Sequence, residues 1–204
     1  MKRLFARRLP AAFLLVLLFA PAACKKKAVQ FRFETDADVV RLIDESKIGY
    51  VPATFMVLSD VHLYDTTLGT KGAAFEDYLA DDRKLLVESE AILDEAVAQI
   101  IARRPQFVLF TGDSTKDGER QAHELFASRL ARIEAAGIGV YVVVGNHDIN
   151  NPHAVRYDGS QTHRVQNVSP AQFAVIYDAY GYAEAIERDP NSLAYVAEPL
   201  PGLW

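Results

Sequence analysis

The sequence lacks several features that define particular protein classes. Its 204 residues contain one cysteine, Cys24, so the chain cannot form an internal disulfide bond. It has no internal repeat and no low-complexity segment, and its charged fraction of 24% is ordinary for a soluble globular protein. The apolar run at residues 11–20 falls well short of the ~20 residues that a transmembrane helix needs. One globular domain is therefore the expectation.

The apolar run follows a basic segment that contains no acidic residue. A charged segment followed by a short apolar segment is the pattern of a secretory signal peptide. We therefore predict a signal peptide over residues 1–23, a tether and domain edge over residues 24–50, and a globular domain over residues 51–204. The predicted signal peptide directs the protein out of the cytoplasm.

The end of the predicted signal peptide fits two kinds of processing. Residues 20–22 form an ordinary small-x-small cleavage site, whereas Cys24 stands where a bacterial lipoprotein carries its lipidated cysteine. Pro21 departs from the leucine that is usual in lipoproteins. A lone thiol is a liability in an oxidising compartment, which favours lipidation of Cys24 over plain secretion. Lipidation would anchor the protein to a bacterial membrane on the periplasmic or exterior side, with residues 25–27 beside the headgroups.

The chain is acidic, and it becomes more so without the predicted signal peptide. Loss of residues 1–23 removes four basic and no acidic residues, so the formal net charge falls from -5 to -9. An acidic body argues against an extended nucleic-acid-binding surface. A small phosphorylated substrate remains compatible with this charge, since bound divalent cations would reverse the field around a site.

Three short apolar runs predict strands, and two amphipathic segments between them predict helices. The runs at residues 55–58, 107–110 and 140–144 are rich in aromatic and β-branched residues, as buried parallel strands are. Helical spacing of apolar residues predicts helices over about 76–103 and 119–136. The order strand, helix, strand, helix, strand predicts an α/β fold with parallel strands joined by right-handed crossovers.

The rest of the chain carries weaker signals. Residues 150–169 are polar and without period, which predicts a long loop beside the functional edge of the sheet; its His153 and His163 are candidates for substrate contact or for polar loop surface. A helix is expected from Ser169-Pro170 to about Tyr180. The segments 192–196 and 203–204 are expected to form a hairpin of a second sheet, with residues 198–202 as its turn.

Polar clusters directly follow each of the three predicted strands. They are Asp60-Val61-His62, Gly112-Asp113 and Gly145-Asn146-His147-Asp148. In open α/β sheets, ligands and catalytic groups gather at the carboxyl ends of the strands. Carboxylate, imidazole and carboxamide donors suit Mn, Fe, Zn or similar divalent ions better than copper(I). Taken singly, each aspartate has an alternative role as the cap of the following helix.

The order of these motifs over residues 54–148 resembles that of the calcineurin-like metallophosphoesterases, which hydrolyse phosphate esters with two divalent metal ions. The resemblance implies the N-terminal part of an αββα sandwich. It makes Asp60 and His62 ligands of the first metal, Asp113 the bridging carboxylate, and Asn146 a ligand of the second metal. The identity of the metals is left open.

The resemblance also implies catalytic roles after the third strand. His147 would bind the phosphate and donate a proton to the leaving oxygen, a role suited to imidazole near neutral pH. Asp148 or Asp117 would orient His147. The family often carries an acid three places after the bridging aspartate, but Lys116 occupies that place here, so the role of Asp117 is open. His123, inside a predicted helix, is expected to be a surface or packing residue.

The second-sheet histidine motifs of the resembled family, Gly-His and Gly-His-x-His, are absent from the sequence. We therefore expect the second sheet to be incomplete and the chain to be the N-terminal part of a longer protein. Residues 1–204 alone are expected to be inactive. The predicted activity is hydrolysis of a phosphate mono- or diester, on a small molecule or a phosphorylated substrate. The alternative is an exported lipoprotein that binds metal or phosphate without turnover. The sequence does not indicate the substrate or the oligomeric state.

Overall fold

The computed structural model describes Arg41 and residues 52–204. The predicted signal peptide, the lipidation candidate Cys24 and nearly all of the predicted tether lie outside the described residues. The chain divides into two compact units, residues 1–50 and 51–204. Within the part that the structure describes, no helix has the length and apolar character needed to cross a membrane.

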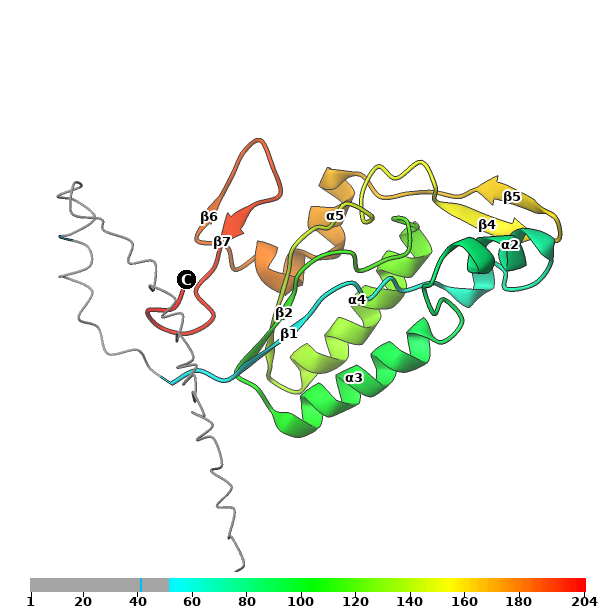
Figure 1. Ribbon diagram of the computed structural model, residues 1–204. Coiled ribbons are helices and arrows are strands. Elements are labelled where there is room, and N and C mark those ends of the chain that lie inside the picture. Colours follow the sequence, from blue (N-terminus) through cyan, green and yellow to red (C-terminus); the bar gives the residue numbers. More distant parts are fainter. Residues whose placement is uncertain (1–40, 42–51) are drawn as a thin grey trace, which may run out of the picture. The chain divides into compact units, whose positions relative to one another are not determined.

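A three-stranded parallel sheet lies at the centre of the second unit (Figure 1). It consists of β1 (Phe55–Leu58), β2 (Phe107–Phe110) and β3 (Gly139–Val142), with β2 in the middle. All three predicted strands and their parallel arrangement are confirmed. The third strand begins one residue earlier and ends two residues earlier than expected, although Val143 N still donates to Phe110 O at 3.0 Å.

Two helices, α3 (Ser89–Arg103) and α4 (Arg120–Ala135), lie side by side against one face of this sheet (Figure 1). Successive side chains of a strand point to opposite faces, so one set of strand residues packs against the helices. The main core there comprises Leu93, Val97, Ile100, Val108, Phe110, Phe126, Leu130, Ile133, Val140 and Val142. On the other face Phe55 and Val57 remain 47% and 53% exposed.

The single long helix expected over residues 76–103 is wrong. The chain instead forms α2 (Ala73–Asp81) and α3, joined by a non-helical segment. The break begins at Asp82, whose carboxylate accepts hydrogen bonds from Tyr78 Oη at 2.8 Å and from Lys84 N at 3.1 Å. An aspartate side chain that bonds nearby backbone in this way competes with helix formation.

The expected loop at residues 150–169 is also incorrect, because it contains a β-hairpin. Strands β4 (Val155–Asp158) and β5 (Gln161–Arg164) pair antiparallel around Gly159. Tyr157 of β4 is buried in a second, smaller core. This core contains Tyr64, Leu68, Phe75, Leu86 and Tyr157. The hairpin and α2 therefore form one packed unit at the side of the sheet (Figure 1).

A short 3-10 helix, Thr66–Leu68, precedes α2, and helix α5 (Pro170–Ile176) follows the hairpin. A π-helical segment, Asp178–Tyr182, continues from α5, so the helix expected to reach Tyr180 ends earlier. Within this segment the regular helical conformation is lost at Tyr180 and Gly181, and the φ of 109° at Gly181 lies in the left-handed region that a regular helix excludes.

The expected pairing of the last segments is wrong. Strand β7 (Tyr195–Val196) pairs antiparallel with β6 (Glu187–Arg188), which precedes it, rather than with residues 203–204. Leu203 instead forms an isolated bridge with Leu200. The turn expected nearby is therefore present, but it closes only this single bridge.

Candidate metal and phosphate site

The loops that follow the three parallel strands meet at one edge of the sheet. After β1, Asp60 N donates to Gly112 O at 3.2 Å and His62 N donates to Asp113 O at 2.9 Å. After β3, His147 N donates to Asp113 Oδ1 at 2.9 Å. The structure thus brings the predicted residues of the three clusters together through backbone hydrogen bonds.

The close approach of the loops depends on glycine. A Cβ atom on Gly145 would lie 2.1 Å from Asp113 N and 2.2 Å from Asp113 Oδ1. Gly112 has a φ of 99°, and a Cβ there would lie 2.9 Å from Gly145 Cα and N. A side chain at either position would force the loops apart.

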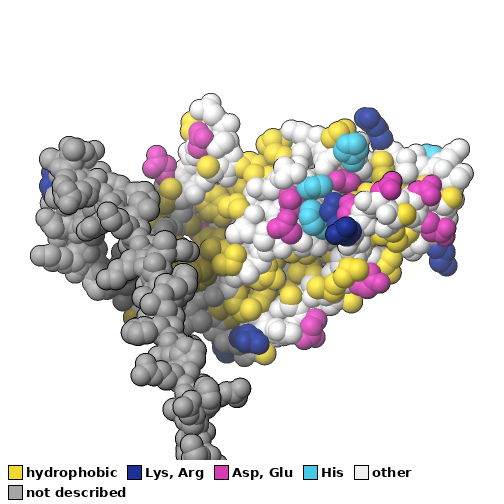
Figure 2. Space-filling model, viewed as in Figure 1, with side chains coloured by type: hydrophobic (Ala, Val, Ile, Leu, Met, Phe, Trp, Pro, Cys, Tyr) yellow, Lys and Arg dark blue, Asp and Glu magenta, His cyan; other side chains and the backbone are white. Residues whose placement is uncertain are grey.

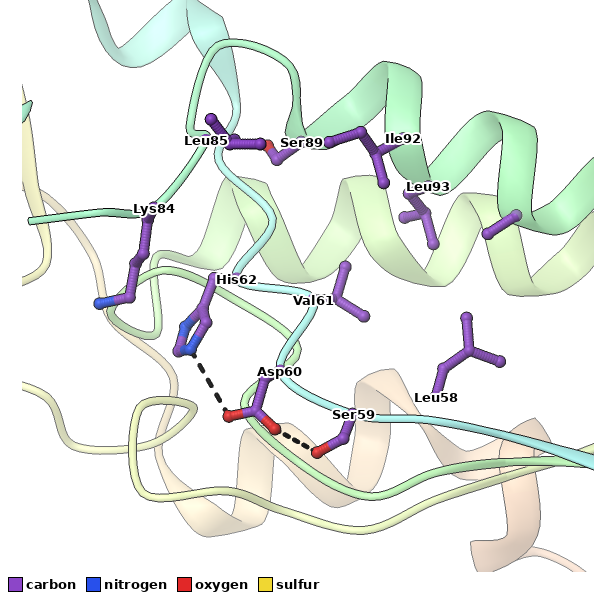
Figure 3. A pocket seen from close by; sticks show the side chains of 11 residues that line it. Leu58, Ser59, Asp60, Val61, His62, Lys84, Leu85, Ser89, Ile92 and Leu93 are labelled. Atoms are coloured by element: carbon purple, nitrogen blue, oxygen red, sulfur yellow. Dashed lines mark hydrogen bonds and ion pairs between the residues drawn. The ribbon is translucent and has the colours of Figure 1, made fainter.

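Three of the predicted metal ligands face one another. Asp60, His62 and Asp113 each offer a ligand atom, and these atoms all lie within 4.8 Å of one another. Figure 3 shows the His62 ring turned toward the Asp60 carboxylate, with Nε2 3.8 Å from Oδ1. Two carboxylates and one imidazole form a donor set that suits a divalent ion.

The His62 ring has the properties of a metal ligand. Its Nε2 atom faces the Asp60 carboxylate, while its buried Nδ1 atom makes no hydrogen bond of normal geometry among the described residues. Burial, followed by electrostatic repulsion from the Lys84 and His147 side chains, lowers the pKa of His62 below its usual value of 6.5. The ring is therefore held in the neutral form that binds metals.

The backbone of these residues adopts an uncommon conformation. Asp60, His62 and Asp113 have φ values of 54°, 44° and 51°, in the left-handed region that residues other than glycine rarely occupy. Backbone strain of this kind clusters at functional sites, where surrounding structure holds it in place. The hydrogen bonds between the loops provide that support.

Asn146, the predicted ligand of the second metal, lies between Gly145 and His147 in the loop after β3. This loop contacts Asp113 through His147 N. The Asn146 side chain is exposed and has no hydrogen-bond partner in the described part of the chain. Its carboxamide oxygen is therefore available as a ligand.

His147 is fixed on one side of its ring. Its Nδ1 atom lies 2.7 Å from the Lys116 carbonyl oxygen and 3.0 Å from Asp117 Oδ1. A carbonyl oxygen only accepts hydrogen bonds, so Nδ1 carries the proton and Nε2 is the nitrogen left for other partners. The rings of His147 and His62 lie edge to face with centroids 4.9 Å apart, which places the two histidines in one site.

Of the two acids predicted to orient His147, Asp117 is the one in contact with the ring. Asp148 is fully buried, and it accepts hydrogen bonds from Thr115 N at 3.0 Å and from Gly145 N at 2.9 Å. Asp148 thus ties the loop after β2 to the loop after β3 and lies beneath the site. Beside it, His123 Nε2 lies 2.7 Å from Asp148 O, which agrees with the packing role expected for His123.

Three side chains beside the site had no predicted role: Lys84, Lys116 and Asn151. Asn151 Nδ2 donates to Asp117 Oδ1 at 3.2 Å and to the His147 carbonyl at the same distance. Lys84 affects His62 through its charge. No spacing in the sequence indicates these contacts, because they depend on how the loops fold over one another.

Two hollows open beside the histidines. One, of about 360 Å³, is lined by Asp60, His62 and Lys84 on one side and by apolar residues such as Leu85 and Ile92 on the other (Figure 3). The other, of about 470 Å³, lies beside His147 between α2 and the β4–β5 hairpin. Histidine, acidic and basic side chains gather on this part of the surface (Figure 2).

The two loop histidines differ in position. His153 lines the second hollow, on the same side as His147. His163 lies in β5, where its Nε2 atom is 3.8 Å from Asp158 Oδ2. His153 is thus the one of the two that is placed to face a ligand in this hollow.

Comparison with known proteins identifies the family. The model of the calcineurin-like phosphoesterase family matches residues 53–195, which is more than half of the chain. The chain belongs to this family. The predicted family is thereby confirmed, and the α/β fold with parallel strands alternating with helices agrees with it. Calcineurin-like phosphoesterases are hydrolases of phosphate esters that work with divalent metal ions, and the Asp60, His62 and Asp113 group is a candidate site for such ions.

One solved structure that is similar to this calcineurin-like phosphoesterase is that of a dimetal phosphatase from Danio rerio. The two chains are 29% identical over a match that covers 48% of this chain and 31% of that chain, with a TM-score of 0.37. The chain thus spans about a third of the length of that phosphatase. No curated protein matches the chain.

Proposed function

We propose that the protein hydrolyses a phosphate mono- or diester with two divalent metal ions, of the Mn, Fe or Zn type. The observation that carries this proposal is the group of ligand atoms on Asp60, His62 and Asp113, which all lie within 4.8 Å of one another. Asp60 and His62 would hold the first ion, Asp113 would contribute to both, and Asn146 would contribute to the second.

The side chains of the site divide the remaining work among them. When bound, the ions supply an activated water as nucleophile and neutralise the phosphoryl oxygens. The Nδ1 proton of His147 is donated to the Lys116 carbonyl and Asp117, which leaves Nε2 to face the leaving oxygen. In the imidazolium form of the ring, Nε2 carries a second proton, and this is the proton that would pass to the leaving oxygen. Asp148 holds the loops that carry Asp113 and His147 in register.

An activity screen tests this proposal. The full-length protein, with any residues encoded after Trp204 included, is stripped of metal, supplied with Mn²⁺ or Zn²⁺, and assayed with phosphate mono- and diesters of different leaving groups. We expect metal-dependent turnover that Asp113→Asn abolishes. Tight binding of metal without turnover of any ester would instead indicate a protein that binds metal or phosphate and does not catalyse hydrolysis.

We also propose that the protein is exported and anchored to a bacterial membrane by a lipid on Cys24. The support is the basic and apolar pattern of residues 1–23 and the position of the only cysteine directly after it. Cys24→Ser is expected to move the protein from the membrane fraction to the soluble fraction, as followed by fractionation and mass spectrometry of the mature N-terminus. Cys24→Ser protein that partitions like the wild type, or a mature N-terminus at Ala23, would support plain secretion.

A further inference from the structure

Lys116 is a buried lysine in the loop that follows β2, and its side chain is only 1% exposed. Burying an ammonium group is costly unless opposite charges and hydrogen-bond acceptors surround it. Here the Nζ atom donates to Asp117 Oδ2 and lies 3.5 Å from Glu119 Oε1. Two carboxylates therefore hold the ammonium in one position.

Two tyrosine rings complete the surroundings of this ammonium. The Nζ atom lies 4.5 Å from the ring centroid of Tyr78 in α2 and 5.7 Å from that of Tyr157 in β4. A cation is attracted to the negative face of an aromatic ring, more strongly where water is excluded. Burial raises the pKa of both phenols, so the rings stay neutral. Lys116 thus connects the loop after β2 to α2 and to the hairpin.

The two oxygens of Asp117 have different partners. Oδ2 accepts the hydrogen bond of Lys116, whereas Oδ1 faces His147 Nδ1 at 3.0 Å and Asn151 Nδ2 at 3.2 Å. The terminal torsion of an aspartate has a broad, two-fold preference and does not by itself select this orientation. The ammonium bound to one oxygen therefore fixes the plane of the carboxylate, and with it the direction in which the other oxygen faces the His147 ring.

Glu119 has a separate function in this cluster. It is fully buried, and its Oε2 atom accepts a hydrogen bond from Asp117 N at 2.9 Å. It therefore holds the backbone of Asp117, while Lys116 holds the side chain. The separation of these two contacts allows them to be tested independently.

We propose that Lys116 is a positioning residue for the proton donor: its buried ammonium locks the Asp117 carboxylate in the orientation that holds His147 by Nδ1 and leaves Nε2 toward the leaving oxygen. The last part of this statement rests on the proposed function. The contact between Lys116, Asp117 and His147 is testable without turnover.

The first test observes the His147 ring directly. Protein labelled with ¹⁵N-histidine is studied by long-range proton–nitrogen NMR at neutral pH, and the His147 Nδ1 proton is assigned with His147→Gln. The Asp117→Asn variant gives the reference chemical shift of the Nδ1 proton when His147 has no carboxylate partner. Lys116→Met combined with Glu119→Gln removes one positive and one negative charge together, so the buried site stays balanced.

We expect the chemical shift of the Nδ1 proton in the double variant to move toward its value in Asp117→Asn. In Glu119→Gln alone, the chemical shift should keep its wild-type value. A wild-type signal in the double variant, or in Asp117→Asn, overturns the proposal. Lys116→Gln with Glu119→Gln is the second pair if the first does not fold, because a carboxamide keeps a donor in the buried site but shortens its reach to Asp117.

The second test uses turnover of two esters. An alkyl phosphate has a poor leaving group that needs a proton donor, whereas an aryl phosphate with an acidic phenol needs little help. Because general acids contribute ~10²–10⁴-fold, we expect kcat for the alkyl ester to fall about 10-fold or more in the double variant, with a smaller loss for the aryl ester and an unchanged KM. Equal losses for both esters would show that Lys116 supports the fold alone.

The two tests separate failure of this inference from failure of the proposed function. If the wild-type protein hydrolyses neither ester, the proposed function is wrong, and the NMR result still decides whether Lys116 orients Asp117. A third comparison adds Asp117→Asn to the double variant. Because the two side chains act through one contact, the added substitution should cause little further loss of alkyl-ester turnover, and a full additive loss would contradict the shared contact.

Discussion

At the residue scale, the predicted metal ligands have an energetically unfavourable backbone conformation. Left-handed conformations of residues other than glycine cost about 1–3 kcal/mol each, and three predicted ligands share this conformation. The hydrogen bonds from Asp60 N and His62 N to the loop after β2 offset part of that cost. The ligand positions are therefore determined by the backbone before any ion binds.

Among the ligands, Asp113 should tolerate substitution least. Its carboxylate is proposed to contact both ions, and its Oδ1 atom also accepts the hydrogen bond from His147 N. We therefore expect Asp113→Asn to lower both metal content and kcat more than His62→Ala does, since the latter removes a ligand of one ion. Metal content by mass spectrometry and steady-state kinetics provide the measurement, with Asp158→Asn in the exposed hairpin turn as the matched control. An Asp113→Asn protein with normal metal content and turnover would contradict the bridging role.

The ligands could be predicted from the sequence, but their supporting contacts could not. Asp60, His62, Asp113 and Asn146 follow directly behind apolar strands, and the ends of parallel strands meet at one edge. The contact between Lys116 and Asp117 depends on how deeply a loop is buried, which no spacing records. For the same reason the sequence left open whether Asp117 or Asp148 contacts His147.

At the scale of elements, the sequence prediction failed where side-chain hydrogen bonds interrupt a segment with helical spacing. Leu85 and Leu86 continue the helical spacing of α3, yet Asp82 ends α2 by bonding Tyr78 and Lys84. Leu86 then packs in the smaller core with Tyr64 and not with the sheet. The β4–β5 hairpin was missed because its strands are short and polar, although Asp158-Gly159 is a common turn pair.

The start of α5 offers a measurable element-scale effect. Ser169 Oγ accepts a hydrogen bond from Gln172 N at 3.3 Å, and the Gln172 side chain accepts one from Ser169 N at 3.0 Å. Loss of such a capping residue typically costs about 1 kcal/mol. Ser169→Ala should therefore lower the free energy of unfolding by about that amount in urea denaturation. Ser160→Ala, the same change in the exposed turn of the hairpin, is the control and should have little effect.

At the scale of the whole second unit, the two faces of the sheet differ. One is covered by α3 and α4, whereas the other leaves apolar side chains such as Phe55, Val57 and Val143 exposed within the described residues. The covered face links the sheet, α4 and α5 into one core through Phe126 and Tyr177. Stability should therefore depend mainly on the covered side, which also contains the buried His123.

His123 should make this stability sensitive to mild acid. Burial lowers the pKa of His123 below its usual value of 6.5, so the unfolded chain binds a proton first as the pH falls. The stabilising contribution is present above that value and is lost as the pH falls below it. We expect the free energy of unfolding to decrease between about pH 7 and pH 5, and the decrease to be smaller in His123→Gln. Burial raises the pKa of Glu119, so this group changes the stability in the opposite direction. Its contribution is the same in the wild type and in His123→Gln and cancels when the two proteins are compared.

The buried Asp148 carboxylate has a kinetic consequence for the site. Thr115 N and Gly145 N belong to loops that are far apart in the sequence, yet Thr115 N donates to Oδ1 and Gly145 N to Oδ2 of this one carboxylate. Movement of the Asp148 side chain breaks both hydrogen bonds at once, so we expect both amides to exchange with deuterium in a single cooperative event and with similar protection. Hydrogen-exchange NMR measures this directly, and Asp148→Asn should separate the two rates. The loops that carry the ligands would then open and close together. A metal ion would therefore find either all of the ligands in place or none of them.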